Sequence, residues 1–392
     1  MKILLVHNEY GKYSGEEAVV DKMAETLRHS GWEVAQLRMS TSGLNDSLKG
    51  KIRGFISGIY SPSGVRAMRN ALKREKPDVV NVHNLYPFIS PAALRECKRV
   101  GVPVVMTIHN YRLICPTGLF MRDNKPCEVC LEKGNEWGCI KYNCEHSIFK
   151  SIGYAARNAV ARIKRHYMDC VDVFACITDF QRQKLIQSGF PKEKILVIPN
   201  SVDITDKPSY PIGEYVAYSG RISQEKGVDM IIDVARNHPE IQFKFAGAVR
   251  DRNIVRNLPS NIELLGYLKG DQLKEFYSKA RFFVMASRWY EGFPMAILEA
   301  ASYGKPMIAP NHGGFTEIIG SDDDSIGILT TPSDIDSLDK AIKKLWDSPA
   351  ESNKLGKAAY EKLKSQYSTD VITQKWNILL TTIIKNYNIN IT

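Results

Sequence analysis

The chain of 392 residues lacks several features that mark well-defined protein classes. No apolar run approaches the roughly 18 residues of a membrane-spanning helix. The sequence has no short-period repeat, no low-complexity tract, no zinc-finger spacing of cysteine and histidine, no aromatic RNA-binding signature and no long Lys/Arg run. These absences argue against an integral membrane protein, a repeat protein and a nucleic-acid-binding protein.

Composition narrows the class further. With 44% hydrophobic and 24% charged residues the protein is globular, and its length favours two domains over one. The first residues, Met-Lys-Ile-Leu-Leu-Val-His, hold an apolar run that is too short for a signal peptide and typical of a first buried strand, so we expect a cytosolic protein. The net charge of +10 suits an anionic membrane surface or a phosphorylated substrate; nucleic acid ranks last because its motifs are missing.

Short apolar runs alternate with helical periodicity along nearly the whole chain, which is typical of parallel sheets covered on both faces. A polar, proline-containing stretch at 204–213 is the best linker candidate. We predict an α/β protein with two doubly wound domains facing a cleft, at 1–203 and 204–367, and a closing helix at 368–392 that crosses back to pack on the first domain. The predicted strands are 2–6, 34–37, 78–82, 104–108, 171–177 and 194–198 in the first domain, and 215–219, 242–246, 262–265, 281–286, 306–309 and 326–329 in the second.

The most informative segment runs from Glu291 to Glu299 and sets two carboxylates around the start of a predicted helix, 295–303. The N–H groups at a helix start favour a bound phosphate, and a carboxylate nearby can hold sugar hydroxyls. The separation does not match the acid/base pair of a glycosidase, which flanks a bond from two sides. The segment therefore predicts a binding site for a sugar joined to a phosphate, with two solvated surface acids as the alternative.

A second motif lies between a predicted strand and a helix, at 218–227. Gly220 permits a positive φ angle or a close backbone approach. Arg221 and Lys226 place two cations at the carboxyl end of a parallel strand, where open α/β sheets bind their ligands. Two cations of different geometry suit a diphosphate, whereas the alternative is a turn with solvated charges.

Residues 219–229 (Ser-Gly-Arg-Ile-Ser-Gln-Glu-Lys-Gly-Val-Asp) and 291–306 (Glu-Gly-Phe-Pro-Met-Ala-Ile-Leu-Glu-Ala-Ala-Ser-Tyr-Gly-Lys-Pro) together resemble the signature of the retaining glycosyltransferases of family 4. Those enzymes have the GT-B fold, in which two Rossmann-like domains face a deep cleft. The resemblance covers nearly the whole chain and includes 199–203 and 313–317. It implies an acceptor-binding first domain and a nucleotide-sugar-binding second domain.

The resemblance also implies a role for each matching residue of the second domain. Arg221 and Lys226 would hold the donor diphosphate and neutralise the leaving nucleotide, without a metal or other cofactor. Glu299 would accept hydrogen bonds from the ribose, and Glu291 would face the transferred sugar. The backbone around the helix start would help to bind phosphate or sugar, through Gly292, Phe293, Pro294, Met295 and Ala296.

In the first domain the resemblance points to two places. His109, at the end of a buried strand, would contact the donor sugar, and Asn110 replaces the commoner aspartate on the acceptor side. Gly15 and Glu16 belong to the loop 8–17, which in the family approaches the donor phosphate and the acceptor. The alternatives are a structural histidine and a plain strand–helix turn.

The implied reaction is retaining hexosyl transfer from a nucleotide-diphosphate sugar, with UDP or GDP as the favoured nucleotide. The expected acceptor is a polyprenyl-diphosphate-linked saccharide of surface polysaccharide synthesis, such as lipopolysaccharide or capsule, at the cytoplasmic face of the membrane. A sugar phosphorylase or a nucleotide-sugar epimerase of the same fold is an alternative. A non-enzymatic, metal-stapled membrane scaffold is an alternative of another class.

Two further regions stay open. An insertion at about 111–147 holds Cys127, Cys130, Cys139 and Cys144, which are candidates for a structural zinc site, although reduced cysteines in an acceptor-site loop are favoured. The segments 49–73 and 150–166 are basic and partly apolar, and they predict contact with anionic lipid. An ordinary solvated helix face is the alternative. The residues expected to reach lipid are Phe55, Ile56, Ile59 and Tyr60, with the cations Lys51, Arg53, Arg66, Arg69, Lys73, Arg157, Arg162, Lys164 and Arg165.

Overall fold

The computed structural model describes residues 1–9, 14–40, 48–205, 208–210, 213–321 and 324–389, without the side chains of 48–53 and 388. The chain forms two compact units. The first comprises Met1–Phe120, Glu128–Pro199 and Thr373–Thr392, and the second comprises Met121–Cys127 and Asn200–Ile372. Among the described residues, no helix is long and apolar enough to cross a membrane.

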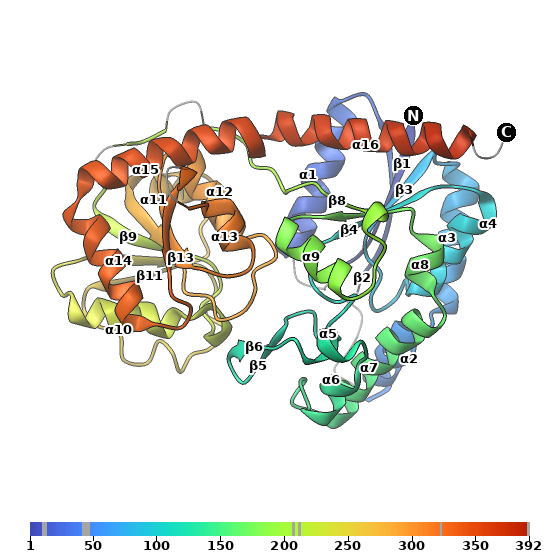
Figure 1. The fold of residues 1–392 in the computed structure, drawn as a ribbon, viewed down its shortest axis with the longest axis horizontal. Coiled ribbons are helices and arrows are strands. Elements are labelled where there is room, and N and C mark those ends of the chain that lie inside the picture. The colour runs from blue at the N-terminus through green and yellow to red at the C-terminus, as the bar shows by residue number, and fades with distance from the viewer. Residues whose placement is uncertain (10–13, 41–47, 206–207, 211–212, 322–323, 390–392) are drawn as a thin grey trace. The chain divides into compact units, whose positions relative to one another are not determined.

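The first unit is built on a parallel sheet of six strands in the order β2-β1-β3-β4-β7-β8 (Figure 1). The strands form because their short runs of branched and aliphatic residues are buried by helices on both faces. Strands β3 and β4 are buried along their whole length. Their bounds are β1 Lys2–Glu9, β2 Glu33–Ser40, β3 Val79–Asn84, β4 Val104–Ile108, β7 Val173–Cys176 and β8 Ile195–Val197.

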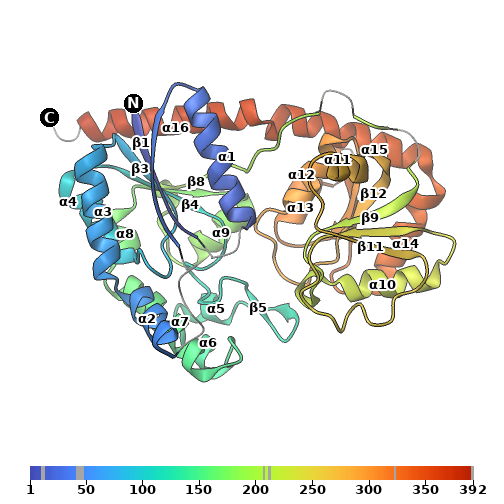
Figure 2. The ribbon, with the colours of Figure 1, turned by 180° about the vertical axis from the view of Figure 1, so that it is seen from behind.

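The helices of this unit include the closing helix of the chain, α16 (Thr369–Ile389). Its residues from Thr373 onward group with the first unit, and Asn377 accepts a hydrogen bond of 2.8 Å from the indole of Trp32. The other helices are α1 Gly15–His29, α3 Pro62–Glu75, α4 Leu94–Val100, α8 His166–Cys170 and α9 Asp179–Gln187. A further group of helices, seen below the sheet in Figure 2, comprises α2 Leu48–Ile59, α5 Val129–Lys133, α6 Trp137–Lys141 and α7 Ile148–Ile163. The short strands β5 Met121–Arg122 and β6 Lys125–Pro126 pair with each other and group with the second unit.

The second unit repeats the architecture with a parallel sheet in the order β11-β10-β9-β12-β13-β14. Its core is rich in aromatic side chains, among them Tyr218, Phe243, Phe245 and Phe282, which are fully buried. The strands are β9 Tyr215–Ser219, β10 Phe243–Ala246, β11 Ile262–Gly266, β12 Ala280–Val284, β13 Met307–Pro310 and β14 Gly327–Thr330. The helices are α10 Val228–Asn237, α11 Gly270–Lys279, α12 Met295–Ser302, α13 Gly314–Ile319, α14 Ile335–Asp347 and α15 Pro349–Lys362.

The prediction of two Rossmann-like parallel sheets is confirmed, because each predicted apolar run contains or overlaps a strand. The strand orders also locate the ligand sites. In an open parallel sheet, ligands bind beyond the carboxyl ends of the strands, at the point where the strand order reverses. That point lies between β1 and β3 in the first unit and between β9 and β12 in the second.

Candidate functional site

Glycines bring the loops of the second unit together at its reversal point. Gly227 follows a single 3-10 turn and has a φ angle of 64°. A Cβ atom there would lie 1.9 Å from the carbonyl oxygen of Ala286, so the loop after β9 packs directly on the end of the segment after β12. Arg288 links the segment after β12 to α10, since its guanidinium donates to both carboxylate oxygens of Asp229 at 2.7 and 2.6 Å.

This packing joins Lys226 to Glu291, which are 65 residues apart in the chain. The Lys226 ammonium donates to Oε1 of Glu291 at 2.6 Å, and both side chains are largely buried, with 12% and 9% exposed. The same oxygen accepts hydrogen bonds from the Ser287 hydroxyl at 2.8 Å and the Trp289 indole at 2.7 Å. A cation and a carboxylate are thus held at one point, with three donors fixing the carboxylate.

The surroundings keep Glu291 ionised. Burial raises the pKa of a carboxyl group, but the charge of Lys226 and the hydrogen bonds from Lys226, Ser287 and Trp289 outweigh it, so the pKa of Glu291 lies below its ordinary value. The pair is therefore an ammonium beside a carboxylate at neutral pH. Separating two buried charges of this kind costs about 3–5 kcal/mol unless another partner replaces the one removed.

Glu299 is held differently. It lies on α12, where the hydroxyl of Tyr277 donates to its Oε2 at 2.5 Å. The same Tyr277 hydroxyl lies 3.0 Å from the hydroxyl of Ser219, at the end of β9. Burial raises the pKa of Glu299, and the hydrogen bond from Tyr277 opposes that rise. Tyr277 thus links Glu299 of α12 to the end of β9, where the strand order reverses.

Helix α12 begins at Met295, as the sequence predicted, and Pro294 precedes it without a side-chain cap. Pro294 has no N–H, so the helix-start donors are those of Phe293, Met295 and Ala296, while the Ile297 N–H bonds to the Pro294 carbonyl at 3.0 Å. Gly292 packs against the next loop, since a Cβ atom at Gly314 would lie 2.7 Å from its carbonyl oxygen.

Arg221 lies apart from this pair. Its side chain is half exposed and its guanidinium is 3.6 Å from the carboxylate of Glu225. Gly220, next to Arg221, has a φ angle of 153°. Its carbonyl oxygen would lie 1.9 Å from a Cβ atom on Gly247, so this turn packs against the loop after β10. The structure therefore brings Lys226 and Glu291 into contact and leaves Arg221 at the edge of the same loop.

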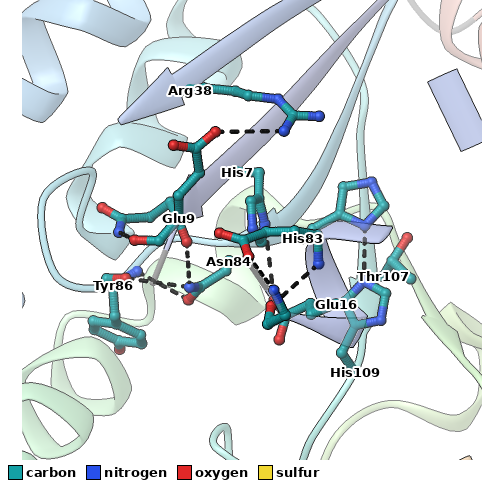
Figure 3. Close-up of polar contacts among 12 residues, drawn as sticks. His7, Glu9, Glu16, Arg38, His83, Asn84, Tyr86, Thr107 and His109 are labelled. Atoms are coloured by element: carbon teal, nitrogen blue, oxygen red, sulfur yellow. Dashed lines mark hydrogen bonds and ion pairs between the residues drawn. The ribbon is translucent and has the colours of Figure 1, made fainter. Parts of the chain in front are cut away.

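In the first unit, three histidines gather at the carboxyl ends of β1, β3 and β4 (Figure 3). His83 Nδ1 lies 2.8 Å from His109 Nε2, and the two rings stack with centroids 5.1 Å apart. The ring of His7 meets that of His83 edge-on at 6.4 Å, and its Nδ1 lies 3.8 Å from a carboxylate oxygen of Glu16 on α1. The predicted residues His109 and Glu16 thus share one cluster, which we call the histidine cluster (His7, His83, His109 and Glu16).

Burial makes these imidazoles neutral at pH 7. It lowers the pKa of His109 to about 4 and that of His83 well below its ordinary value, and it lowers the pKa of His7 despite the opposing charge of Glu16. A neutral imidazole has one N–H donor and one bare acceptor nitrogen, so the contact between His83 and His109 couples their tautomers: one ring donates its N–H there and the other accepts. Nε2 of His83 is buried and has no hydrogen-bond partner among the described residues.

Asparagines follow each of the three histidines and shape the adjoining loops. Asn84 donates to the Asn8 carbonyl at 2.8 Å, and the Asn8 side chain accepts from the Phe88 N–H at 2.9 Å. Asn110 accepts from the Arg112 N–H at 3.0 Å. A small pocket lies beside them, lined by His83, Asn84, Leu85, Tyr86, Met106, Thr107, Ile108, His109, Asn110, Arg112, Leu113 and Tyr167.

The loop predicted to approach the donor is only partly described. Asn8 and Glu9 belong to β1, whereas residues 10–13 lie outside the described residues. Gly15 opens α1 behind the cap Ser14, whose hydroxyl and the Glu17 carboxylate form a reciprocal capping box. Among the described residues, no atom lies within 4 Å of a Cβ built on Gly15.

The cysteine-rich insertion forms small helices. Cys139 is buried, and its pKa is raised by a hydrogen bond with the Cys144 thiol and by burial. A Cβ atom on Gly138 would lie 3.2 Å from the sulfur of Cys130. Cys127 and Cys139 are not joined by a disulfide. Within the part of the chain that the structure describes, no group of three or more His, Cys, Asp or Glu side chains is arranged to hold a metal ion.

Several site residues were not among those predicted from the sequence. His7 and His83 carried a usable signal, because the dipeptide His-Asn ends three successive sheet strands, at 7–8, 83–84 and 109–110. Tyr277 carried none, since nothing in a helical stretch 22 residues away marks it as the partner of Glu299. Ser287 and Trp289 lay beside a recognised motif, but only the fold turns their donors onto Glu291.

Comparison with known proteins covers both units. The family model for Glycosyltransferase Family 4 matches residues 13–206, and the model for Glycosyl transferases group 1 matches residues 204–362. An uncharacterized 42.6 kDa protein in the cps region of Klebsiella pneumoniae is 26% identical over 389 residues, which cover 87% of this chain and 96% of that protein. The putative colanic acid biosynthesis glycosyltransferase WcaL of Escherichia coli is 24% identical, over 67% of this chain and 70% of WcaL.

Solved structures share the fold over almost the whole length. Sucrose-phosphate synthase from Thermosynechococcus elongatus matches with a TM-score of 0.72 at 16% identity, covering 98% of this chain and 99% of that one. HepE from Anabaena in complex with UDP matches with a TM-score of 0.69 at 17% identity, covering 97% of this chain and 100% of that one. At these identities the likeness establishes the arrangement of strands and helices alone.

Proposed function

The chain belongs to glycosyltransferase family 4 and has the GT-B fold, and from that premise we propose that it moves a sugar, with retention, from a nucleotide-diphosphate sugar to a saccharide hydroxyl. The observation that carries the proposal is the Lys226–Glu291 pair at the reversal point of the second sheet. A buried ammonium held beside a carboxylate and a helix start offers one group for phosphate and one for sugar hydroxyls.

In the proposed donor site, Lys226 and the more exposed Arg221 bind the diphosphate, and the α12 start adds its N–H groups. Glu299, fixed by Tyr277, accepts hydrogen bonds from the ribose, and Glu291 accepts them from the transferred sugar. Binding a dianionic phosphate compensates Lys226 for any weakening of its contact with Glu291. Arg221, Lys226 and the start of α12 therefore balance the charge of the donor diphosphate without a metal. We expect transfer to persist in the presence of a chelator.

The proposed reaction breaks the bond between the anomeric carbon and the phosphate oxygen while the acceptor oxygen bonds to the same face of that carbon. The acceptor proton passes to the departing phosphate, whose growing charge Arg221 and Lys226 stabilise. His109, neutral because burial lowers its pKa to about 4, serves as a hydrogen-bonding group for the donor sugar and not as a cation. Glu16 and Asn110 lie on the acceptor side of this scheme.

The donor nucleotide is proposed from relatives. HepE has been solved with UDP-glucose, which supports UDP, and GDP remains the second candidate. The proposed acceptor is a polyprenyl-diphosphate-linked saccharide at the inner face of the cell membrane. The names of two relatives, one in a cps region and one in colanic acid biosynthesis, support a role in surface polysaccharide synthesis.

Nucleotide binding tests the donor site. We expect calorimetry to show binding of UDP or GDP to the full chain, with Lys226→Ala and Glu299→Ala each weakening it by about tenfold or more. Lys244→Ala is the matched control, because Lys244 is an ion-paired lysine of the same unit on β10. Unchanged affinity in both site variants, or no binding of any nucleotide, would refute the assignment.

A further inference from the structure

Helix α7 presents an apolar face to solvent. Its residues Ile148, Ile152, Ala156, Ala159 and Ile163 recur at spacings of three and four, so they share one side of the helix. The three isoleucines on this stripe are 44%, 39% and 67% exposed. Such exposure is unusual because it costs free energy to leave an apolar side chain in water. The buried residues of the helix include Ser151, Ala155, Asn158 and Ala161.

Neighbouring elements extend this surface. Phe149 of α7 is 79% exposed and Trp137 of α6 is 72% exposed. Helix α2 lies beside α7 in both views (Figures 1 and 2), and the Phe55 ring sits where a Cβ atom of Gly153 would be only 2.4 Å away. Ile56 of α2 is 58% exposed. We call the exposed apolar residues of α2, α6 and α7 the α7 face: Phe55, Ile56, Tyr60, Trp137, Ile148, Phe149, Ile152 and Ile163.

The same elements are strongly basic. Segments 48–60 and 129–165 hold ten Lys and Arg residues against three Glu and no Asp, which gives seven of the ten net positive charges of the chain. Lys141, Lys150 and Lys164 are exposed around the α7 face. Arg157, which was expected to reach lipid, is 8% exposed, stacks on Tyr154 and donates to a backbone carbonyl, so its predicted contact with lipid is wrong.

Exposed aromatic and branched side chains surrounded by lysine and arginine match the chemistry of an anionic bilayer surface. Apolar side chains are stabilised when they enter the boundary between headgroups and acyl chains, and the cations are attracted to acidic headgroups. A nucleic acid would use the charge but not the isoleucine stripe, and a neutral protein partner would use the stripe but not the charge. We propose that the α7 face docks the chain on an anionic membrane, with Trp137, Phe149 and Ile152 inserted among the lipids.

This proposal rests on the proposed function only in that a lipid-linked acceptor requires the chain to reach a bilayer. Its test is co-sedimentation of the full chain with phosphatidylcholine vesicles, with and without about one third phosphatidylglycerol. We expect the acidic vesicles to bind at least about tenfold more protein than the neutral ones, and Trp137→Ser with Phe149→Ser to reduce that binding by about tenfold. Ile378→Ser is the matched control, since Ile378 is 61% exposed on α16.

Three outcomes would overturn the proposal: no binding of wild-type protein to acidic vesicles, equal binding of the Trp137/Phe149 variant, or loss by that variant of a dimer seen without lipid. The last would show that a second copy covers the α7 face. A second variant, Lys150→Ala with Lys164→Ala, should weaken binding to acidic vesicles and leave the neutral ones unaffected. All variants should bind UDP or GDP as the wild type does, so failure of docking and failure of the proposed donor site are separate results.

Discussion

The histidine cluster predicts a specific loss of stability in mild acid. His109 has a pKa of about 4 in the folded chain, because burial disfavours the imidazolium, whereas an unfolded histidine titrates near ~6.5. Between these two pKa values the imidazole of His109 is protonated in the unfolded chain and neutral in the folded chain. Stability is therefore complete above about pH 6.5 and falls as the pH drops toward 4. For His109 alone the loss at pH 5 is about 2 kcal/mol, and His7 and His83 act in the same direction.

Denaturant unfolding of the full chain at pH 7.5 and 5 measures this loss, with His109→Gln as the perturbation. Glutamine keeps hydrogen-bonding capacity near His83 but cannot gain a proton, so the variant should lose about 2 kcal/mol less than the wild type between the two pH values. The readout is the change with pH and not the stability of the variant at pH 7.5. His29→Gln, at the exposed end of α1, is the matched control and should keep the wild-type dependence. An equal dependence in wild type and His109→Gln would refute the reasoning.

Three further predictions concern the second unit. Lys226→Met should destabilise the protein by about 3–5 kcal/mol in denaturant unfolding by leaving Glu291 buried without its cation, and adding Glu291→Gln should restore part of that stability but no nucleotide affinity. Tyr277→Phe removes the donor to Glu299 and should weaken nucleotide binding by about 1.5–3 kcal/mol in calorimetry, with a larger loss at pH 6 than at pH 8 because the pKa of Glu299 rises further. Gly227→Ala should lower the melting temperature sharply, since its Cβ atom would overlap a carbonyl oxygen at 1.9 Å; an unchanged melting temperature would mean that the two loops separate easily.

The fold was predictable because its signal is local and repeated. Each strand is a short run of buried residues, such as Val104–Ile108 and Tyr215–Ser219, whose predicted bounds the structure reproduces. The order of the strands in each sheet could not be predicted, because the residues joined by a parallel crossover do not show which strand lies beside which. The hairpin of β5 and β6 was also missed, since two-residue strands are too short to show alternation.

The residues of the site were easier to predict from the sequence than the contacts between them. Lys226 and Glu291 were each found in a motif, yet their ion pair depends on how tightly Gly227 lets two loops approach. Burial, which decides whether an acid or an imidazole is charged, is a property of the folded chain. The repeated His-Asn dipeptide could have pointed to His83, but its 2.8 Å contact with His109 depends on the pairing of β3 with β4 in the folded sheet.

Transfer of labelled sugar tests the central claim most directly. A panel of radiolabelled UDP- and GDP-sugars is incubated with the full chain and a lipid extract that supplies polyprenyl-linked saccharides, and label in the lipid phase is counted. We expect transfer from one of these donors by the wild type and by Lys244→Ala, and a loss of at least about 100-fold in Lys226→Ala and in Glu299→Ala. Full transfer by both site variants, or no transfer from any donor while a native lipid acceptor is present, would contradict it.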